Sequence, residues 1–467
     1  MTDVIEGLGR IVGQQHVITD KQKSAIYTEE PRGRYASDCL AVVLPETTEE
    51  VAEIVKFCGQ QNLALVPQGG NTGAMGGAVA NKDQLIVNFK RLNKIIEVNP
   101  TDYTMTVQAG CILANIQETA KRHDRLFPLS LGAQGSCQIG GNLATNAGGI
   151  NVLHYGNTRD LVLGIEVVLS NGKISHGLNA LRKNNTGYDL KNLFIGCEGT
   201  LGIITAAVLK LFPYPKGQVV SLTGLESIDS GVALLSRLKF ASSDRLTTFE
   251  LMSQIAVETA VKHIHGQTDP FDKPYPWYIL AIVHSSEQDS HLKHHIEDTL
   301  ATALGDGLIK DAVIAQNQTQ AQRLILLRED IVEAQKFIGG SIKHDVSVPV
   351  SKVSEFMAHA YRTVKAFMPN ALPYPYGHLG DGNIHFNISQ PADMGKEKFL
   401  ENWKAINTLM HDITHDYQGS FSAEHGIGIS KLDEMDKYKD QTEMELYRQI
   451  KKLLDPKGLL NPGKMLR

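Results

Sequence analysis

The stretch LAVVLPETTEEVAEIVKFCGQQNLALVPQGGNTGAMGG, residues 40–77, carries the pattern that decides the fold. The apolar run LAVVLP predicts a strand, the following apolar positions share one face of a helix, and LALVPQ predicts a second strand. Thr47 and Glu50 have the spacing of a capping box, which predicts where the helix begins. The order strand, helix, strand predicts a β-α-β unit whose last strand runs into a glycine-rich loop, a usual ligand position in such sheets.

Alternating strands and helices continue on the carboxyl side of this unit and predict an α+β protein. LIVNF (85–89) and TMTVQAG (104–110) read as strands and residues 112–123 as a helix. Asn171-Gly172 lies between two strand patterns and predicts a hairpin with a type I′ turn. The proline- and glycine-rich segment 213–217 is typical of a domain boundary.

Length and composition exclude several classes of protein. The chain has 467 residues, a length sufficient for two or three domains. Its net charge is −5. Basic residues are scattered, which argues against nucleic-acid binding, and no apolar run reaches the roughly 20 residues of a membrane span. The first residues lack the pattern of a signal peptide, and the five cysteines include no C-x-x-C pair. These features predict reduced thiols and a cytoplasmic protein.

Three glycine clusters are the main compositional anomaly. They are GGNTGAMGG (69–77), a cluster within residues 131–149, and GCEGTLG (196–202). Backbone amides of such loops can surround a phosphate, although neither a Walker loop nor a G-x-G-x-x-G fingerprint is present. One cluster could be a simple flexible turn, but three in sequence favour an extended dinucleotide groove.

A pair of histidines marks a second candidate site in the stretch PYGHLGDGNIHFN. If Asp381-Gly382 forms a two-residue hairpin turn, His378 lies directly across the ladder from His385. The two imidazoles then share one face with Tyr376 and Asn387, close enough to bind one metal ion. Two histidines on a solvated hairpin remain the alternative.

A third ligand and a base can be named from the stretch SAEHGIG. His378, His385 and Glu424 form the set of two nitrogens and one carboxylate that is typical of an open catalytic Zn²⁺ site. His425 neighbours the third ligand and suits the role of general base. Asn387 could hold the carboxylate or the hydroxyl of a substrate on the histidine face.

Six motifs in order, PQGGNTG, GSCQIGGNLATNAGG, GCEGTLGIIT, GHLGDGNIH, SAEHGIG and NPGK, resemble the flavoprotein family of vanillyl-alcohol oxidase and p-cresol methylhydroxylase. Within this family the chain is most similar to the D-2-hydroxyacid dehydrogenases, from about residue 30 onward. The resemblance implies a two-subdomain FAD-binding domain over residues 1–216, an α+β substrate and metal domain with an antiparallel sheet over 217–430, and a helical segment, 431–467, that returns to the FAD domain.

The resemblance also implies which residues contact FAD. Relatives often attach FAD covalently through a histidine where this chain has Asn71, so non-covalent FAD is expected, and Gln68 stands where relatives frequently have arginine. The implied FAD contacts are Pro67, Gly69, Gly70, Asn71, Thr72, Gly73, Gly135, Ser136, Ile139, Gly140, Gly141, Asn142, Thr145, Asn146, Gly199, Ile203 and Asn461.

Substrate contacts follow partly from the resemblance. Arg328 and Lys343 are implied to bind a substrate carboxylate, with Tyr376 and Asn387 beside them. The alternative for Arg328 and for Lys343 is an ordinary surface ion pair. By the resemblance, Val332 occupies a position where 2-hydroxyglutarate dehydrogenases have threonine. Valine cannot donate a hydrogen bond, which weakens a strict assignment to 2-hydroxyglutarate as the substrate.

The resulting expectation is an FAD- and metal-dependent dehydrogenase that oxidises a D-2-hydroxy acid to its 2-oxo acid. D-2-hydroxyglutarate is favoured over D-lactate and D-malate, with hydride passing from C2 to flavin N5. Electrons then go to a separate acceptor such as an electron-transfer flavoprotein, a quinone or a cytochrome, and a homodimer is possible. The alternatives are an oxygen-using oxidase of the same fold, a glycolate or D-lactate dehydrogenase subunit, an ether-lipid synthase relative that needs no metal ion, and a zinc-stabilised binding module.

Overall fold

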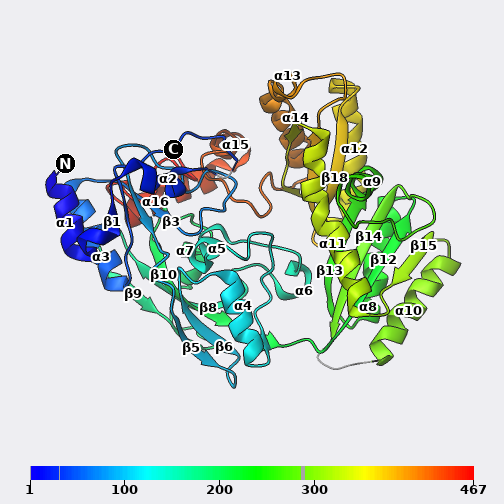
Figure 1. Ribbon diagram of the computed structural model, residues 1–467, viewed down its shortest axis with the longest axis horizontal. Coiled ribbons are helices and arrows are strands. Elements are labelled where there is room, and N and C mark those ends of the chain that lie inside the picture. The colour runs from blue at the N-terminus through cyan, green and yellow to red at the C-terminus, as the bar shows by residue number, and fades with distance from the viewer. Residues whose placement is uncertain (1, 31, 286–289) are drawn as a thin grey trace. The chain divides into compact units, whose positions relative to one another are not determined.

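The structure is a computed structural model that describes residues 2–30, 32–285 and 290–467. It divides into two compact units (Figure 1). The first unit comprises Met1–Gly149, Gly156–Tyr214 and Glu424–Arg467, and the second comprises Ile150–Tyr155 and Pro215–Ala423. Apart from the short segment Ile150–Tyr155, the chain therefore leaves the first unit at the predicted proline-rich segment and returns to it at Glu424.

The predicted β-α-β unit forms the smaller sheet of the first unit. Strands β2, β4 and β3 are parallel in that order, and β1 pairs antiparallel with β2. β4 lies between the two strands that the helix connects, so the unit is a crossover rather than a pair of neighbouring strands. The elements are β1 (Val17–Ile18), β2 (Ala41–Val43), α3 (Thr48–Gln61), β3 (Leu65–Gln68) and β4 (Leu85–Asn88).

The helix α3 begins at the predicted capping residue. The Thr47 hydroxyl accepts the Glu50 amide hydrogen at 3.1 Å. The Glu50 carboxylate accepts the amide hydrogen of Glu46 at 2.7 Å, one residue before the position that a full capping box would use. The buried face of α3, which includes Val51, Ile54 and Val55, packs in the core beneath this sheet.

The larger sheet of the first unit is antiparallel throughout, with strand order β5-β6-β10-β8-β9. Its predicted hairpin is present, but the type I′ turn was wrong. Only Gly172 has a positive φ, of 73°, and its amide donates to the Leu169 carbonyl at 2.8 Å. The elements are β5 (Ile95–Asn99), β6 (Thr104–Gln108), β8 (Val162–Val168), β9 (Ile174–Gly177) and β10 (Ile203–Lys210).

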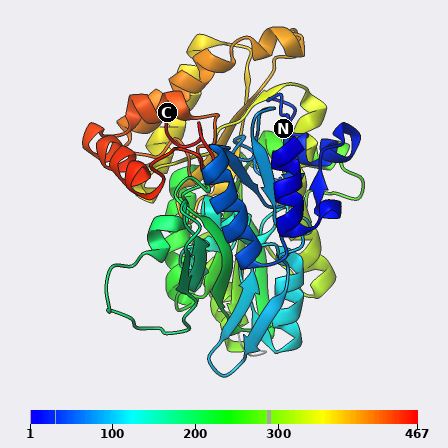
Figure 2. The same cartoon turned by 90° about the vertical axis from the view of Figure 1, so that its left-hand side faces the viewer.

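The remaining elements of the first unit surround these sheets. The C-terminal helices α15 and α16 lead to Leu460, which forms a parallel bridge with Leu65 of β3. The long exposed loop between β9 and α7 extends away from the sheet (Figure 2). The elements are α1 (Thr2–Val12), α2 (Lys21–Thr28), α4 (Leu113–Arg122), β7 (Arg125–Leu126), α5 (Ile139–Thr145), α7 (Lys191–Phe194), β11 (Phe212–Pro213), α15 (Leu432–Tyr438) and α16 (Gln441–Leu454), with a 3₁₀ turn at Gln14–His16.

The second unit is built on an eight-stranded antiparallel sheet. Its strand order is β15-β12-β14-β13-β18-β19-β16, and β17 also pairs with β19. This sheet and the antiparallel sheet of the first unit confirm the predicted α+β class. The strands are β12 (Gly217–Leu225), β13 (Leu246–Ser253), β14 (Trp277–Ser285), β15 (Asp311–Ile314), β16 (Ser341–Ile342), β17 (Val346–Ser347), β18 (Leu372–His378) and β19 (Asn383–Ser389).

Helices cover both faces of this sheet. On one face α8, α10, α12 and α14 share a core with residues such as Leu251 and Phe386, and on the other α9 and α11 pack near Met252 and Tyr376. The helices of the second unit are α6 (Val152–Tyr155), α8 (Ile228–Ala241), α9 (Gln254–His263), α10 (Ser290–Gly305), α11 (Gln318–Ala334), α12 (Val353–Phe367), α13 (Lys396–Leu400) and α14 (Trp403–Asp416), with 3₁₀ turns at Gln335–Ile338 and Val350–Lys352.

The β18-β19 hairpin differs from its predicted register by two residues. His385 pairs with Tyr376 and His378 pairs with Asn383, so the turn contains four residues instead of two. Neighbouring chain segments hold this wider turn, since the Gly380 amide donates to the Phe249 carbonyl at 3.2 Å and the Gly382 carbonyl accepts the Val348 amide hydrogen at 3.1 Å. A shift by an even number of residues keeps every side chain on its predicted face.

No helix among the described residues combines the length and the apolar character needed to cross a lipid bilayer.

Candidate functional site

The two histidines of the hairpin lie together as predicted, but diagonally rather than opposite each other. Their ring centroids are 5.4 Å apart, and both side chains are about nine-tenths buried. Leu379, Ile384 and Phe386 belong to the apolar core on the opposite face. The hairpin therefore presents both imidazoles on a polar wall that is backed by core, which does not fit a solvated hairpin.

A buried carboxylate that the sequence did not reveal adjoins this pair. Glu250 of β13 lies opposite His378 in the sheet, and its Oε1 is 2.5 Å from His378 Nδ1. Its Oε2 accepts from Nε and Nη2 of Arg328 at 2.9 and 2.7 Å. Burial opposes ionisation of Glu250, but the adjacent His378 and Arg328 outweigh it and lower the pKa of this carboxyl to about 2. Glu250 is thus an anion shared between a candidate metal ligand and a candidate substrate ligand.

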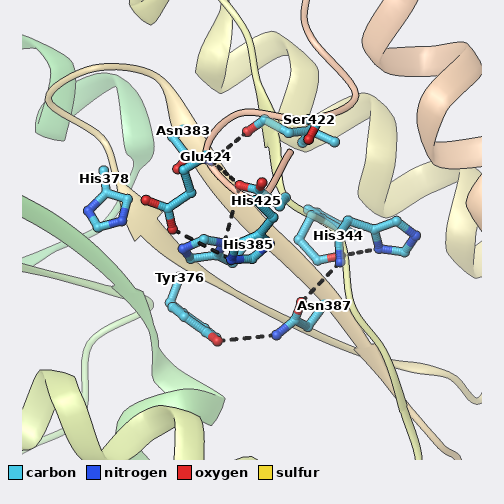
Figure 3. Close-up of polar contacts among 12 residues, drawn as sticks. His344, Tyr376, His378, Asn383, His385, Asn387, Ser422, Glu424 and His425 are labelled. Atoms are coloured by element: carbon cyan, nitrogen blue, oxygen red, sulfur yellow. Dashed lines mark hydrogen bonds and ion pairs between the residues drawn. The ribbon is translucent and has the colours of Figure 1, made fainter. Parts of the chain in front are cut away.

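The third candidate ligand, Glu424, directly follows the last residue of the second unit. That residue, Ala423, donates its amide hydrogen to the Asp345 carbonyl at 3.2 Å. One ligand atom each of His378, His385 and Glu424 lies within 4.8 Å of the other two (Figure 3). Two imidazole nitrogens and one carboxylate oxygen at this separation fit the donor set of a catalytic Zn²⁺ site.

Asp345 is a second carboxylate that the sequence did not single out. It is 4% exposed, and its Oδ1 accepts from the Asn383 side chain at 3.0 Å and lies 3.9 Å from His385 Nδ1. Its position on the connection between β16 and β17 places it beside the histidine face. A carboxylate near the outer nitrogen of a metal-binding histidine is the usual way to orient such a ring.

Tyr376 and Asn387 lie on the predicted face and belong to one buried hydrogen-bond network. The Asn387 amide donates to Gln335 at 2.9 Å and to the Tyr376 hydroxyl at 3.3 Å, and its oxygen accepts the His344 amide hydrogen at 3.2 Å. These bonds fix the orientation of the Asn387 side chain.

Arg328 is not the ordinary surface ion pair that its sequence context allowed. Its side chain is 8% exposed, and its guanidinium lies over the Tyr376 ring at 4.8 Å, in addition to its contact with Glu250. Val332, one helical turn later, is 41% exposed. Lys343 is half-buried on the connection between β16 and β17.

The glycine clusters of the first unit line a cleft. Residues from β3, the first glycine loop, α5 and the approach to β10 meet there, together with His425. Twelve of the seventeen predicted FAD contacts line it, namely Pro67, Gly69, Gly70, Asn71, Thr72, Gly73, Gly140, Gly141, Asn142, Thr145, Gly199 and Ile203.

The other five predicted FAD contacts lie outside the lining. Gly135 and Ser136 are exposed in a turn before α5, and Ile139 is fully buried in the core. Asn146 ends α5 in a left-handed conformation and accepts the Arg159 amide hydrogen. Asn461 donates to the carbonyls of Gly77 and Glu198, so it connects two parts of the lining without being part of it.

Two sequence departures from the relatives have local structural roles. Asn71 has a φ of 53°, a conformation that asparagine tolerates better than most residues, and its amide donates to the Glu29 carbonyl at 2.8 Å. Gln68 is 1% exposed and donates to the Tyr27 carbonyl at 2.8 Å. Both side chains thus hold the glycine loop against residues 27–29.

The cleft has features that fit FAD. A Cβ added at Gly73 or Gly141 would meet no atom within 4 Å, so both backbones border open space. Among the described residues, no hydrogen-bond partner is found for one buried side-chain oxygen each of Glu30, Gln138 and Asn142, all of which line the cleft. The N–H and O–H groups of a flavin and its ribityl chain are the donors that such acceptors need.

Glu198 fastens the loop that carries His425 to the cleft. Its carboxylate accepts the amide hydrogens of Ile427 and Gly428 at 2.7 and 2.8 Å, and its own backbone has a positive φ of 51°. Burial raises the pKa of Glu198 despite these two hydrogen bonds. A glutamate within the third glycine cluster was visible in the sequence, but the partner loop lies more than 200 residues away.

Known proteins match the chain over its full length. Residues 39–177 match the family described as FAD binding domain, and residues 214–465 match the family described as FAD linked oxidases, C-terminal domain. A probable mitochondrial D-2-hydroxyglutarate dehydrogenase of Oryza sativa subsp. indica is 38% identical over 467 residues, 100% of this chain and 82% of that protein. The D-2-hydroxyglutarate dehydrogenase of Stutzerimonas stutzeri is 35% identical over 473 residues, 100% of this chain and 99% of that protein.

Solved structures confirm the fold. A p-cresol methylhydroxylase with bound substrate superposes with a TM-score of 0.78 at 17% identity, over 99% of this chain and 96% of that chain. An alkyldihydroxyacetonephosphate synthase has a TM-score of 0.73 at 19% identity, over 99% and 84% of the two chains.

The two-sheet flavin fold and its glycine-lined cleft define an FAD-dependent oxidoreductase. The match of residues 214–465 and the full-length relatives make the assignment narrower: the chain belongs to the family of FAD-linked oxidases, in the group of the D-2-hydroxyglutarate dehydrogenases. The resemblance to the vanillyl-alcohol oxidase and p-cresol methylhydroxylase family is thereby confirmed.

Proposed function

We propose that the protein oxidises D-2-hydroxyglutarate to 2-oxoglutarate with non-covalently bound FAD and a divalent metal ion, and passes the electrons to a separate acceptor. The observation that carries this proposal is the agreement along the whole chain with proteins named for that reaction, at 35–38% identity. A second support is the presence of both halves of such a site, a glycine-lined cleft and a cluster of two histidines and a glutamate.

The candidate residues have separate proposed roles in metal binding and substrate binding. His378, His385 and Glu424 would hold the metal, and a metal bound by such a set makes a hydroxyl group more acidic. Arg328 and Lys343 would orient the substrate carboxylates, with Tyr376 and Asn387 forming the adjoining wall. A flavin bound in the cleft would supply the acceptor for the hydrogen and electron pair that leave C2.

His425 is the proposed base, because it lines the flavin cleft and is bonded to Glu424. The proposed base and the proposed metal ligand Glu424 are therefore joined by one peptide bond, which keeps them close to each other. His425 would accept the proton of the substrate hydroxyl while C2 loses hydrogen with its electron pair, which leaves the 2-oxo acid.

Zn²⁺ is the metal we propose, since imidazole and carboxylate ligands without cysteine leave positions for a substrate on this ion. The geometry of the candidate set fits this proposal, because Nδ1 of His378 lies 2.5 Å from one oxygen of Glu250, so a metal would bind at Nε2.

The test is anaerobic addition of D-2-hydroxyglutarate, D-lactate and D-malate to the purified, metal-loaded protein while flavin absorbance is followed. We expect D-2-hydroxyglutarate to bleach the flavin with the highest kcat/KM. A higher kcat/KM for D-lactate would instead mean that Val332, where threonine is expected, has changed the preference for a second carboxylate. Absence of bleaching by all three acids would refute the proposed function.

A further inference from the structure

We propose that Glu250 is a positioning residue that sets the metal ligand His378 and the substrate ligand Arg328 at the same time. This inference rests on the proposed function, because it takes His378 as a metal ligand. It concerns a residue outside every motif of the chain, on the central strand β13.

The geometry assigns one oxygen of Glu250 to each partner. Oε1 is 2.5 Å from His378 Nδ1, and Oε2 is 2.9 Å from Nε and 2.7 Å from Nη2 of Arg328. The Glu250 side chain is only 2% exposed, and the strands β13 and β18 hold it directly opposite His378. Water therefore competes little for either contact.

The contact with His378 selects one tautomer of the imidazole. A carboxylate only accepts hydrogen bonds at neutral pH, so Nδ1 must carry a hydrogen, and in the neutral imidazole that binds a metal Nε2 then presents the lone pair. Nε2 is then the nitrogen that a metal would bind, and the carboxylate increases its basicity. Glu250 would thus prepare His378 for metal binding before any ion arrives.

The contact with Arg328 limits how that guanidinium can meet a substrate. Two of its nitrogens are bound to one oxygen of Glu250, and its plane lies over Tyr376 at 4.8 Å. Because both contacts fix the guanidinium, Nη1 is the group left to face a substrate carboxylate. Glu250 consequently links the metal side and the carboxylate side of the site.

Glu250→Gln tests the tautomer argument, because an amide has only one accepting atom. Arg328 carries a full charge and should attract the amide oxygen, which turns the NH₂ group toward His378 Nδ1. The hydrogen of His378 must then move to Nε2 and block the metal, as an Asp→Asn change does to the histidine of serine proteases. We expect metal affinity, measured by competition with a chromogenic chelator, to fall by about 10–100-fold.

A double variant provides a rescue that a merely structural role would not predict. When Arg328→Met is added to Glu250→Gln, the amide oxygen is released and can accept from His378 Nδ1. We expect metal affinity to return to within about threefold of that of Arg328→Met alone, an interaction that only coupled sites show. Failure of this rescue in a folded protein would overturn the tautomer argument.

A pair of variants without buried charge covers the case in which Glu250→Gln does not fold, since an unpaired Arg328 is costly. Arg328→Met/Glu250→Gln and Arg328→Met/Glu250→Leu have the same net charge and differ only in the acceptor for His378. We expect the leucine variant to bind metal about 10–100-fold more weakly. Equal affinity of the two variants would overturn the inference.

Glu258→Gln is the matched control, because Glu258 is an exposed glutamate on the neighbouring helix α9. It should leave metal affinity unchanged. The two proposals fail differently. A wild-type protein that binds no metal would overturn both this inference and the metal in the proposed function, whereas normal metal binding in Glu250→Gln would overturn this inference alone.

Discussion

The imidazole of His425 is the side chain whose removal best separates chemistry from binding. It is 32% exposed in the side chain, and its Nε2 lies 3.7 Å from Glu424 Oε1. We expect His425→Ala to slow flavin reduction by D-2-hydroxyglutarate by about 10²–10⁴-fold, the usual contribution of a general base. FAD content and metal content should stay at wild-type levels, and stopped-flow absorbance with metal analysis measures all three.

His415→Ala is the control for this change, because His415 is an exposed histidine of α14. Loss of metal in His425→Ala would show that His425 is a ligand rather than the base, a role that its grouping with Asp345 and Glu424 also allows. Unchanged flavin reduction would rule out either role.

At the residue scale, the candidate metal-binding histidines could be predicted from the sequence, but the carboxylates that contact the site residues could not. His378 and His385 lie seven positions apart, so their shared face follows from local strand geometry. Glu250 is 128 positions from His378, and Glu198 is more than 200 positions from the loop that it holds. Glutamates are common in the sequence, so these two could not be singled out. The pairing of β13 with β18 identifies Glu250, and the contact of the 427–428 loop identifies Glu198.

The β18-β19 hairpin shows which part of an element can be predicted. Alternation predicted both strands and both faces, because side-chain direction repeats every two residues. The turn length was wrong because Gly380 and Gly382 bond to Phe249 and Val348, which lie on other segments. At Asn171-Gly172 the predicted turn type required two residues with positive φ, and only Gly172 has one.

Gly382→Ala tests whether the four-residue turn holds the histidine pair. Gly382 has a φ of 83°, and an added Cβ would lie 2.1 Å from the Val348 carbonyl oxygen. Gly266→Ala is a matched control, since Gly266 has a φ of 86° and no atom within 4 Å of such a Cβ. Both alanines cost about 1–2 kcal/mol in a left-handed conformation.

The overlap at Gly382 should destabilise that variant by about 1–3 kcal/mol more than the control, as overpacked sites do. Urea unfolding measures the difference. Metal affinity should fall in Gly382→Ala alone, because the turn must move away from Val348 and displaces His378. Equal stability and equal metal affinity of the two variants would mean that the turn adapts without moving the histidines.

At the scale of the whole molecule, local sequence patterns predicted where the strands are, but not which strands pair with each other. The eight-stranded sheet places β13 beside β18, whose residues are more than 120 positions apart, and β4 lies between β2 and β3. Such pairings depend on long-range contacts that no local alternation encodes. The series of motifs along the chain indicated the fold where the periodicities could not, because a resemblance to a known family implies the strand order of that family's fold.

The distribution of the two candidate sites leads to a prediction about metal removal. Every residue that lines the flavin cleft belongs to the first unit, whereas His378 and His385 belong to the second. Dialysis against a strong chelator should therefore remove the metal and leave FAD bound. Flavin reduction by D-2-hydroxyglutarate should then slow by about 10²-fold or more, since the substrate hydroxyl loses the cation that acidifies it.

Flavin absorbance after gel filtration, metal analysis and anaerobic reduction measure the three quantities on one sample. Added Zn²⁺ should restore reduction in proportion to the metal regained, because the FAD half of the site has remained intact. Release of FAD together with the metal would show that the two sites depend on each other for binding. Fast reduction of a metal-free sample would remove the metal from the mechanism and leave His425 and Arg328 to bind and deprotonate the substrate alone.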